Sequence, residues 1–148
     1  GTECIRPGMH GEVTPEAVRP HLTEGVTSVS LMMVNNETGA MSDIAELVRL
    51  VRERSPAAVF HADAVQALGK VAIDVRTLGV DMMTLSAHKL GGPQGAGALI
   101  VRDGAPLASQ IAGGGQAFVN FVVAERLHSR RGSHGSRAEA FTNCCRAV

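Results

Sequence analysis

The sequence predicts an α/β fold with a mainly parallel sheet and crossover helices. Short apolar runs rich in β-branched residues recur along the chain, as in strands that are buried in a parallel sheet. Segments with helix caps or helical periodicity separate these runs, which is the alternation expected of crossover connections. Polar residues gather just where the apolar runs end, so one edge of the predicted sheet is the place to look for a site.

The composition supports one globular domain and excludes several functions. The chain has 148 residues, 45% hydrophobic and 19% charged, with a formal net charge of zero. This balance gives no reason to expect a nucleic acid or a membrane as partner. No apolar run reaches the ~20 residues of a membrane span, and no signal peptide is visible, so we expect a cytoplasmic location. Cys4, Cys144 and Cys145 show neither a disulfide framework nor metal-ligand spacing.

The first predicted elements lie between residues 14 and 39. Thr14 and Pro15 provide a helix cap and a first-turn proline, so we predict a short helix from about 15 to 22, limited by Pro20. Residues 26–34 are β-rich and then continuously apolar, which predicts a strand buried on both faces. The polar turn 35–39 ends this strand.

A second helix and three further strands follow. Ser42 or Asp43 caps a helix that ends at Ser55 and Pro56, and its apolar residues recur at helical spacing: Ile44, Leu47, Val48 and Val51. Residues 57–61 and 82–86 are predicted as buried strands, joined by a short connection containing Asp74, Leu78 and Gly79. Residues 98–102 are predicted as a fourth strand, with an antiparallel direction left open.

The end of the third strand carries an unusual group of side chains. Ser86, His88 and Lys89 lie within four positions, and a turn with four glycines and a proline follows. The chain has only two lysines. A lysine held where an apolar strand meets a glycine turn can lose hydration and present its amine to a carbonyl, as a Schiff-base lysine must. A surface lysine at a strand end is an equally good interpretation of this segment alone.

The neighbouring strand ends favour the Schiff-base interpretation. All six candidate residues fall at or beyond the ends of three successive predicted strands: Asn36, Asp63, Gln66, Ser86, His88 and Lys89. Pyridoxal phosphate needs a lysine, a carboxylate at its pyridine nitrogen, and donors for its phenolic oxygen and phosphate. Asp63 is the candidate for the nitrogen, Gln66 and Asn36 for the phenolic oxygen, Ser86 and His88 for the phosphate, and Lys89 for the Schiff base.

Four ordered segments resemble the class V aminotransferase superfamily, and most closely its cysteine desulfurase branch. They are residues 34–39, 61–66, 86–95 and 113–116, within a likeness that covers roughly residues 8 to 116. The resemblance implies part of an aspartate-aminotransferase-type large domain, pyridoxal phosphate and a homodimer. It also implies removal of sulfur from L-cysteine to give L-alanine, with the sulfur passed as an enzyme persulfide to an acceptor protein, for example in iron-sulfur cluster assembly.

The resemblance also implies roles for individual residues. It repeats the assignments given above for Asp63, Gln66, Ser86, His88 and Lys89, and it places Asn36 at the phenolic oxygen or the substrate carboxylate. His61 is given a structural role at least as readily as a catalytic one. Four further residues are expected to be ordinary surface or turn residues without partners: His10, His21, Glu37 and Gln94.

Residues 117–148 differ from the rest of the chain. They hold five arginines against two acids, three of the four phenylalanines and two of the three cysteines, with no strand alternation. We therefore expect a partial cofactor-binding domain over residues 1–116 and a divergent, disordered segment over 117–148, arising from a reading-frame change or a truncation. Cys144 and Cys145 are not expected to replace the family's sulfur-accepting cysteine, which, like its small domain, has no counterpart in the sequence.

Two alternatives to a cysteine desulfurase stay open at this point. Selenocysteine lyase and other class V enzymes share these motifs. A catalytically inactive fragment that serves as a structural or interaction domain is the alternative from a different class.

Overall fold

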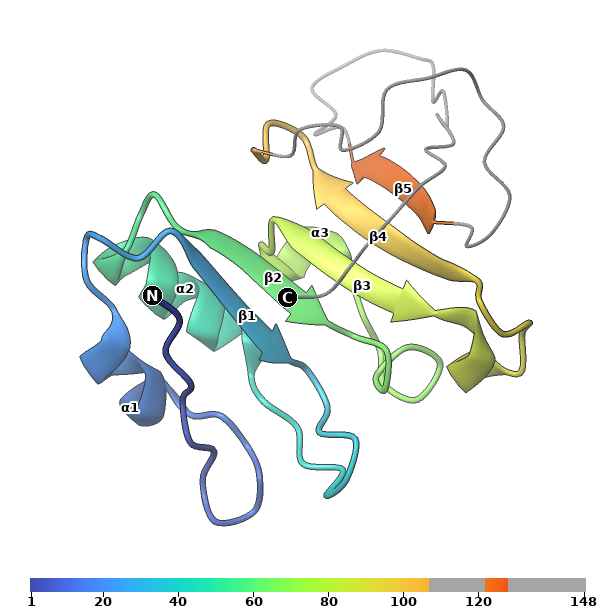
Figure 1. The fold of residues 1–148 in the computed structure, drawn as a ribbon, viewed down its shortest axis with the longest axis horizontal. Coiled ribbons are helices and arrows are strands. Elements are labelled where there is room, and N and C mark those ends of the chain that lie inside the picture. Colours follow the sequence, from blue (N-terminus) through green and yellow to red (C-terminus); the bar gives the residue numbers. More distant parts are fainter. Residues whose placement is uncertain (107–121, 128–148) are drawn as a thin grey trace.

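The computed structural model describes residues 1–106 and 122–127, which form an α/β fold with one sheet and several helices (Figure 1). The strands of the sheet follow one another in chain order: β1 (Ser28–Met32), β2 (Val59–Asp63), β3 (Met82–Ser86), β4 (Gly97–Arg102) and β5 (Val122–Leu127). Neighbouring strands are parallel except for β3 and β4, which are antiparallel. The predicted mainly parallel α/β fold is therefore confirmed, and so is the antiparallel option for the fourth strand.

The helices begin and end where their caps place them. In α1 (Pro15–Val18) the Ala17 amide donates to Thr14 Oγ1 at 3.4 Å, and the chain tightens into η1 (Arg19–His21) at Pro20. In α2 (Ile44–Arg54) the Glu46 amide donates to Asp43 Oδ1 at 2.9 Å, which identifies Asp43 as the cap. Two further short helices lie within the described residues, α3 (Val75–Leu78) and η2 (Ala87–Leu90).

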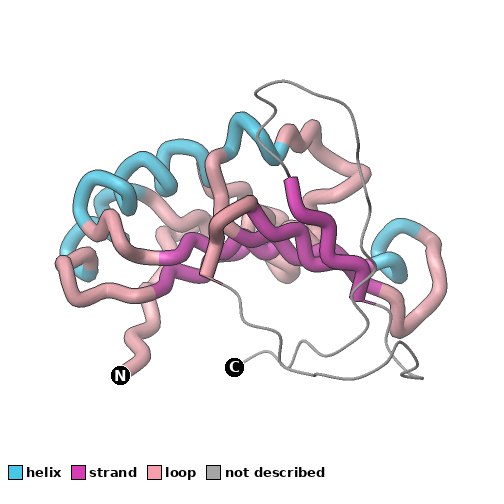
Figure 2. Tube along the Cα trace, turned by 90° about the horizontal axis from the view of Figure 1, so that it is seen from above, coloured by secondary structure: helices cyan, strands magenta, loops and turns pink. Residues whose placement is uncertain are grey.

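The main hydrophobic core lies between the sheet and α2. The inward face of α2 presents Leu47 and Val51, and the sheet presents Phe60, Ala62 and Met83, all fully buried. Figure 2 shows the helices gathered on one side of the sheet, with η2 at its edge. Because side chains alternate along a strand, the register places His61 and Asp63 on the other face of β2.

Two expectations about the strands need correction. The first strand was predicted to be buried on both faces, but β1 lies at one end of the described sheet and its Ser28 and Ser30 are exposed. The second strand begins two residues later than predicted, since Pro56 and Ala57 form a turn, and it ends at Asp63.

The region after residue 116 is described in part. Residues 122–127 form β5, which pairs in parallel with β4, although no strand was expected there. The remainder of 117–148, including Cys144 and Cys145, lies outside the described residues. The boundary at residue 116 stays a prediction.

A buried carboxylate joins four elements at the amino end of β3. Asp81, with a side chain only 3% exposed, accepts hydrogen bonds from the Phe60 amide (2.7 Å) and Arg52 Nη2 (2.6 Å). It also accepts from Arg102 Nε at 2.9 Å, and Arg102 Nη2 contacts the same oxygen. Burial raises the pKa of Asp81, but these hydrogen bonds outweigh burial and hold the pKa below its usual value.

Candidate active site at the carboxyl edge of the sheet

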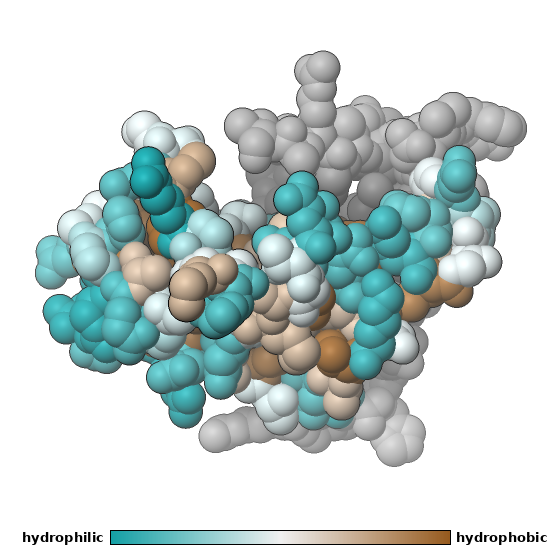
Figure 3. Space-filling model, turned by 90° about the horizontal axis from the view of Figure 1, so that it is seen from below, coloured by the Kyte–Doolittle hydropathy of each residue, from teal (hydrophilic) through white to brown (hydrophobic). Residues whose placement is uncertain are grey.

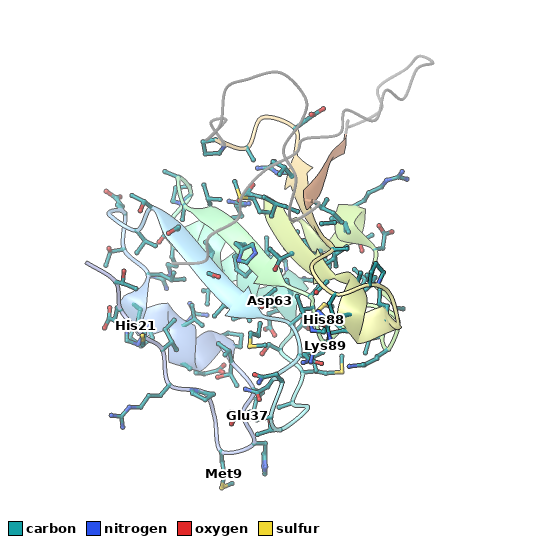
Figure 4. The ribbon with its side chains drawn as sticks, turned by 45° about the vertical axis from the view of Figure 1, so that its right-hand side comes forward. Met9, His21, Glu37, Asp63, His88 and Lys89 are labelled. Atoms are coloured by element: carbon teal, nitrogen blue, oxygen red, sulfur yellow. The ribbon has the colours of Figure 1, made fainter. Side chains whose placement is uncertain are left out.

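The carboxyl ends of β1, β2 and β3 form the edge on which the predicted residues lie. Asp63 is in register with Met32 on one side and Thr84 on the other, so it occupies the middle of this edge. Ser86 lies two residues beyond Thr84 and shares its face of the sheet. Figure 4 shows Asp63, His88 and Lys89 at the same edge, which is where their places in the sequence predict them.

Lys89 sits on η2, a single turn that is closed by backbone hydrogen bonds. The Ala87 amide donates to the Ala96 carbonyl at 3.0 Å, and the Gly92 amide donates to the Ala87 carbonyl at 2.9 Å. Gly91 ends the turn at φ +78°, and a Cβ on Gly92 would lie 3.1 Å from the Ala87 carbonyl oxygen. The glycines after Lys89 thus let the chain reverse closely enough to hold the lysine just beyond β3.

Ser86 and His88 form a hydrogen-bonded pair beside the lysine. Ser86 Oγ and His88 Nδ1 are 2.7 Å apart, and the serine is half-buried while the histidine is exposed. One donor is used within the pair, so a neutral imidazole leaves one donor for an anion, either the serine hydroxyl or the imidazole Nε2–H, and a protonated imidazole leaves both. The pair therefore suits the phosphate role that was predicted for it.

Asn36 and Gln66 line an open depression of about 500 Å³ beside this edge. The turn after β1 forms one wall, where Asn35 Oδ1 accepts hydrogen bonds from the Glu37 and Thr38 amides at 2.9 and 3.0 Å. Lys70 is also part of the lining, and its Nζ donates to Gln66 Oε1 at 3.1 Å. Asp63, Ser86, His88 and Lys89 do not line this depression.

A contact between Gly69 and Leu90 connects the depression with the lysine turn. Gly69 has φ +76°, and a Cβ there would approach Leu90 Cδ2 to 2.6 Å. Leu90 follows Lys89 directly, and Gly69 precedes Lys70. The loop after β2 and η2 therefore lie against each other. Seen from below in Figure 3, the surface shows hydrophilic side chains around smaller hydrophobic areas.

His61 has a clear structural environment. Its Nδ1 lies 2.8 Å from Ser30 Oγ, which ties β2 to β1, and its Nε2 is buried without a partner among the described residues. Burial lowers the pKa of His61, and the carboxylate of Asp63 offsets part of this effect. The structural role expected for His61 agrees with these contacts.

Two side-chain partnerships were not predicted from the sequence. His21, expected to have none, pairs with Glu3 through Nδ1 and Oε1 at 2.8 Å. Lys70 received no role, although its position four residues after Gln66 was a readable signal, because side chains at this spacing can meet on a helical turn.

Several side-chain groups at this edge have no hydrogen-bond partner among the described residues, and they fit pyridoxal phosphate. The second oxygen of Asp63 has no bonded donor among the described residues, whereas Oδ1 accepts from the Val65 amide at 2.9 Å. Neither the Lys89 amine nor the Asn36 amide is bonded to another described side chain. A free amine and a free carboxylate oxygen on the edge, with free amide donors in the depression beside it, are groups that this cofactor requires.

The fold and this edge define an α/β domain that carries a lysine and a carboxylate at the carboxyl edge of its sheet. Residues 3–140 match the model of the family "Aminotransferase class-V", and the chain belongs to this family. Its relatives include the cysteine desulfurase IscS of Pseudomonas entomophila (strain L48), 50% identical over 97 residues, which cover 66% of this chain and 24% of that protein. The chain thus spans about a quarter of the length of such relatives.

Solved structures extend the likeness to three dimensions. A structure described as a NifS-like protein superposes with a TM-score of 0.71 at 32% identity, over 77% of this chain and 31% of the other. Another, described as SspA in complex with cysteine, has a TM-score of 0.56 at 30% identity, over 62% of this chain and 26% of the other. The predicted family resemblance is confirmed.

Proposed function

We propose that this chain is part of a pyridoxal phosphate-dependent cysteine desulfurase. The main observation behind this proposal is that a hydrogen-bonded turn holds Lys89 at the same sheet edge as Asp63. One carboxylate oxygen of Asp63 has no bonded donor among the described residues. Membership of the class V family supports the cofactor, and the identity to cysteine desulfurases supports the reaction. The homodimer, the cytoplasmic location and a separate sulfur-acceptor protein are further parts of the proposal. Among the described residues, no helix is long and apolar enough to cross a membrane.

Each residue has a role toward the cofactor. Lys89 would hold it through its amine, and Asp63 would keep a proton on the pyridine nitrogen by presenting a carboxylate. Gln66 and Asn36 would donate to the phenolic oxygen, and Ser86 with His88 would bind the phosphate. When bound, the cofactor supplies an electron sink that stabilises negative charge at the substrate Cα.

The protein residues then move the protons and orient the substrate. The Lys89 amine would serve as the general base that takes the proton from the substrate Cα. Asn36 is a second donor at the edge and can bind the substrate carboxylate. The reaction balances as L-cysteine plus an acceptor thiol giving L-alanine plus a persulfide: the C–S bond breaks and an S–S bond forms, without a further oxidant.

Visible absorbance of the protein after incubation with pyridoxal phosphate is the test. We expect the unaltered chain to develop a cofactor band that is absent from Lys89→Ala. Borohydride reduction followed by peptide mass mapping should place the cofactor on Lys89 and not on Lys70 or the amino terminus. Labelling elsewhere would reject the assignment of Lys89.

Substrate assays separate the remaining alternatives. Production of alanine and sulfide from L-cysteine supports a desulfurase, and a strong preference for selenocysteine supports the lyase. A cofactor band without turnover of either amino acid indicates an inactive binding domain.

A further inference from the structure

Lys70 is a charged residue beside the proposed site that has no role in the proposed function. It lies four residues after Gln66 in the turns that follow β2, and both residues line the depression that also holds Asn36. Its Nζ donates to Gln66 Oε1 at 3.1 Å. Lys70 is exposed, whereas Gln66 is half-buried. This hydrogen bond therefore restricts the rotation of the Gln66 side-chain amide.

The orientation of the Gln66 amide decides which chemistry it offers. A primary amide carries an acceptor oxygen on one arm and two N–H donors on the other, and a rotation of 180° exchanges them. An ammonium group can only donate, so it must face the oxygen. With Oε1 facing Lys70, the Nε2 donors are directed elsewhere. A phenolic oxygen that carries negative charge needs donors and would be repelled by Oε1.

We infer that Lys70 is a positioning residue that holds the Gln66 amide with its donors available to the phenolic oxygen of pyridoxal phosphate. This inference rests on the proposed function. The contact between Gly69 and Leu90 supports it, because the turn that carries Lys70 is packed directly against the turn that carries Lys89. An exposed lysine thereby acts on the cofactor through another side chain.

The positioning has a spectroscopic consequence. A donor on the phenolic oxygen withdraws electron density from it, which weakens its hold on the proton of the neighbouring Schiff-base nitrogen. Loss of the donor should raise the pH at which the visible band of the bound cofactor titrates. The other charged side chain that lines the depression is Glu37, and Asp63, His88 and Lys89 lie along the edge. None of these is altered by a change at position 70.

Three variants isolate the effect. Lys70→Met removes the donor and keeps a long apolar stem, whereas Lys70→Arg retains a cationic donor and should restore the unaltered behaviour. Arg49→Met on the exposed side of α2 removes one positive charge far from this edge and controls for net charge. We expect Lys70→Met to raise the titration midpoint by roughly half a unit to one unit, the scale of one ordinary hydrogen bond.

A second measurement tests the geometry without cofactor. In the cofactor-free protein, the side-chain amide resonances of Gln66 in 1H–15N spectra should shift in Lys70→Met and stay near their original positions in Lys70→Arg. Unchanged Gln66 resonances in Lys70→Met would overturn the inference. So would an unchanged titration midpoint in a Lys70→Met protein that still binds the cofactor.

Failure of the proposed function has a different signature. If the unaltered chain develops no visible band at any pH, pyridoxal phosphate binding itself is rejected and the cofactor role of Lys70 falls with it. The resonances of Gln66 would still report whether the two side chains are bonded.

Discussion

Replacing Asp81 with asparagine should destabilise the fold without altering the proposed site. The side chain is 3% exposed and receives donors from Phe60, Arg52 and Arg102, which belong to β2, α2 and β4. An asparagine keeps the shape, but it loses the charge and turns two N–H donors toward groups that are donors themselves. The substitution therefore weakens the bonds to both arginines at once.

The expected loss is about 2 kcal/mol. Removing one partner from a buried ion pair costs roughly 3 to 5 kcal/mol, because an uncompensated charge is left behind. Here the side chains of Arg52 and Arg102 are 32% and 54% exposed, so water can solvate them once the carboxylate is gone. About 1 kcal/mol for each weakened charge-assisted bond is the appropriate scale.

Urea unfolding followed by circular dichroism checks this value. With an m value of about 1 to 2 kcal/mol/M, the midpoint should fall by roughly 1 to 2 M. Glu53→Gln is the matched control, since Glu53 is 66% exposed and pairs with Arg54 at 3.5 Å, and it should change the stability by less than about 0.5 kcal/mol. A loss in Asp81→Asn as small as in this control would refute the reasoning.

The pH dependence gives an independent check. Because the folded pKa of Asp81 lies below its usual value, the stabilisation is complete above the unfolded pKa of ~3.9 and is lost as the pH falls through the folded value. The difference in unfolding free energy between the unaltered protein and Asp81→Asn should therefore shrink below about pH 4. A difference that grows in acid would contradict the assigned cause.

Three further predictions concern His61, Gly91 and Thr14. His61 should titrate below ~6.5 in NMR spectra of the folded protein, and Asp63→Asn should lower its pKa further, because the carboxylate favours the charged imidazole. Stability should accordingly decline as the pH falls from ~6.5 through the folded pKa of His61, and a folded pKa at or above 6.5 would be inconsistent with its burial. Gly91→Ala should cost roughly 1 to 2 kcal/mol in urea unfolding, since φ is +78° there, and should change the labelling rate of the Lys89 amine by an acylating reagent; equal stability would show that the turn relaxes. Thr14→Ala should cost about 1 kcal/mol or less through the lost cap of α1, measured the same way, and a gain in stability would count against the cap.

Local signals were sufficient to predict most of the elements. The cap at Asp43 and the apolar spacing through Val51 predicted α2, and the apolar run 82–86 coincides with β3. The exposed face of β1 could not be predicted, because an apolar run does not reveal which strands pair beside it. The pairing of β5 with β4 is likewise a long-range contact without a local pattern.

The positions of several candidate residues could be predicted, whereas their roles stay predictions. The rule that parallel strands bring their carboxyl ends to one edge placed Asp63, Ser86 and Lys89 together. It could not predict that Asn36 and Gln66 would line a separate depression, since this depends on the path of two loops. The bond from Lys70 to Gln66 depends on side-chain orientation, which sequence spacing permits but does not determine.

Asp81 and Lys89 lie beyond opposite ends of β3, so the buried anchor of the fold and the proposed cofactor lysine occupy different ends of one strand. The five-residue strand between them is about 17 Å long. Substitutions at one end can therefore change the stability of the fold with little effect on the lysine at the other end. The effects of substitutions at the two ends on the free energy of unfolding should be additive. A protein engineer could exploit the same separation by first improving the packing around Arg52 and Arg102 and then accepting costly changes near the lysine.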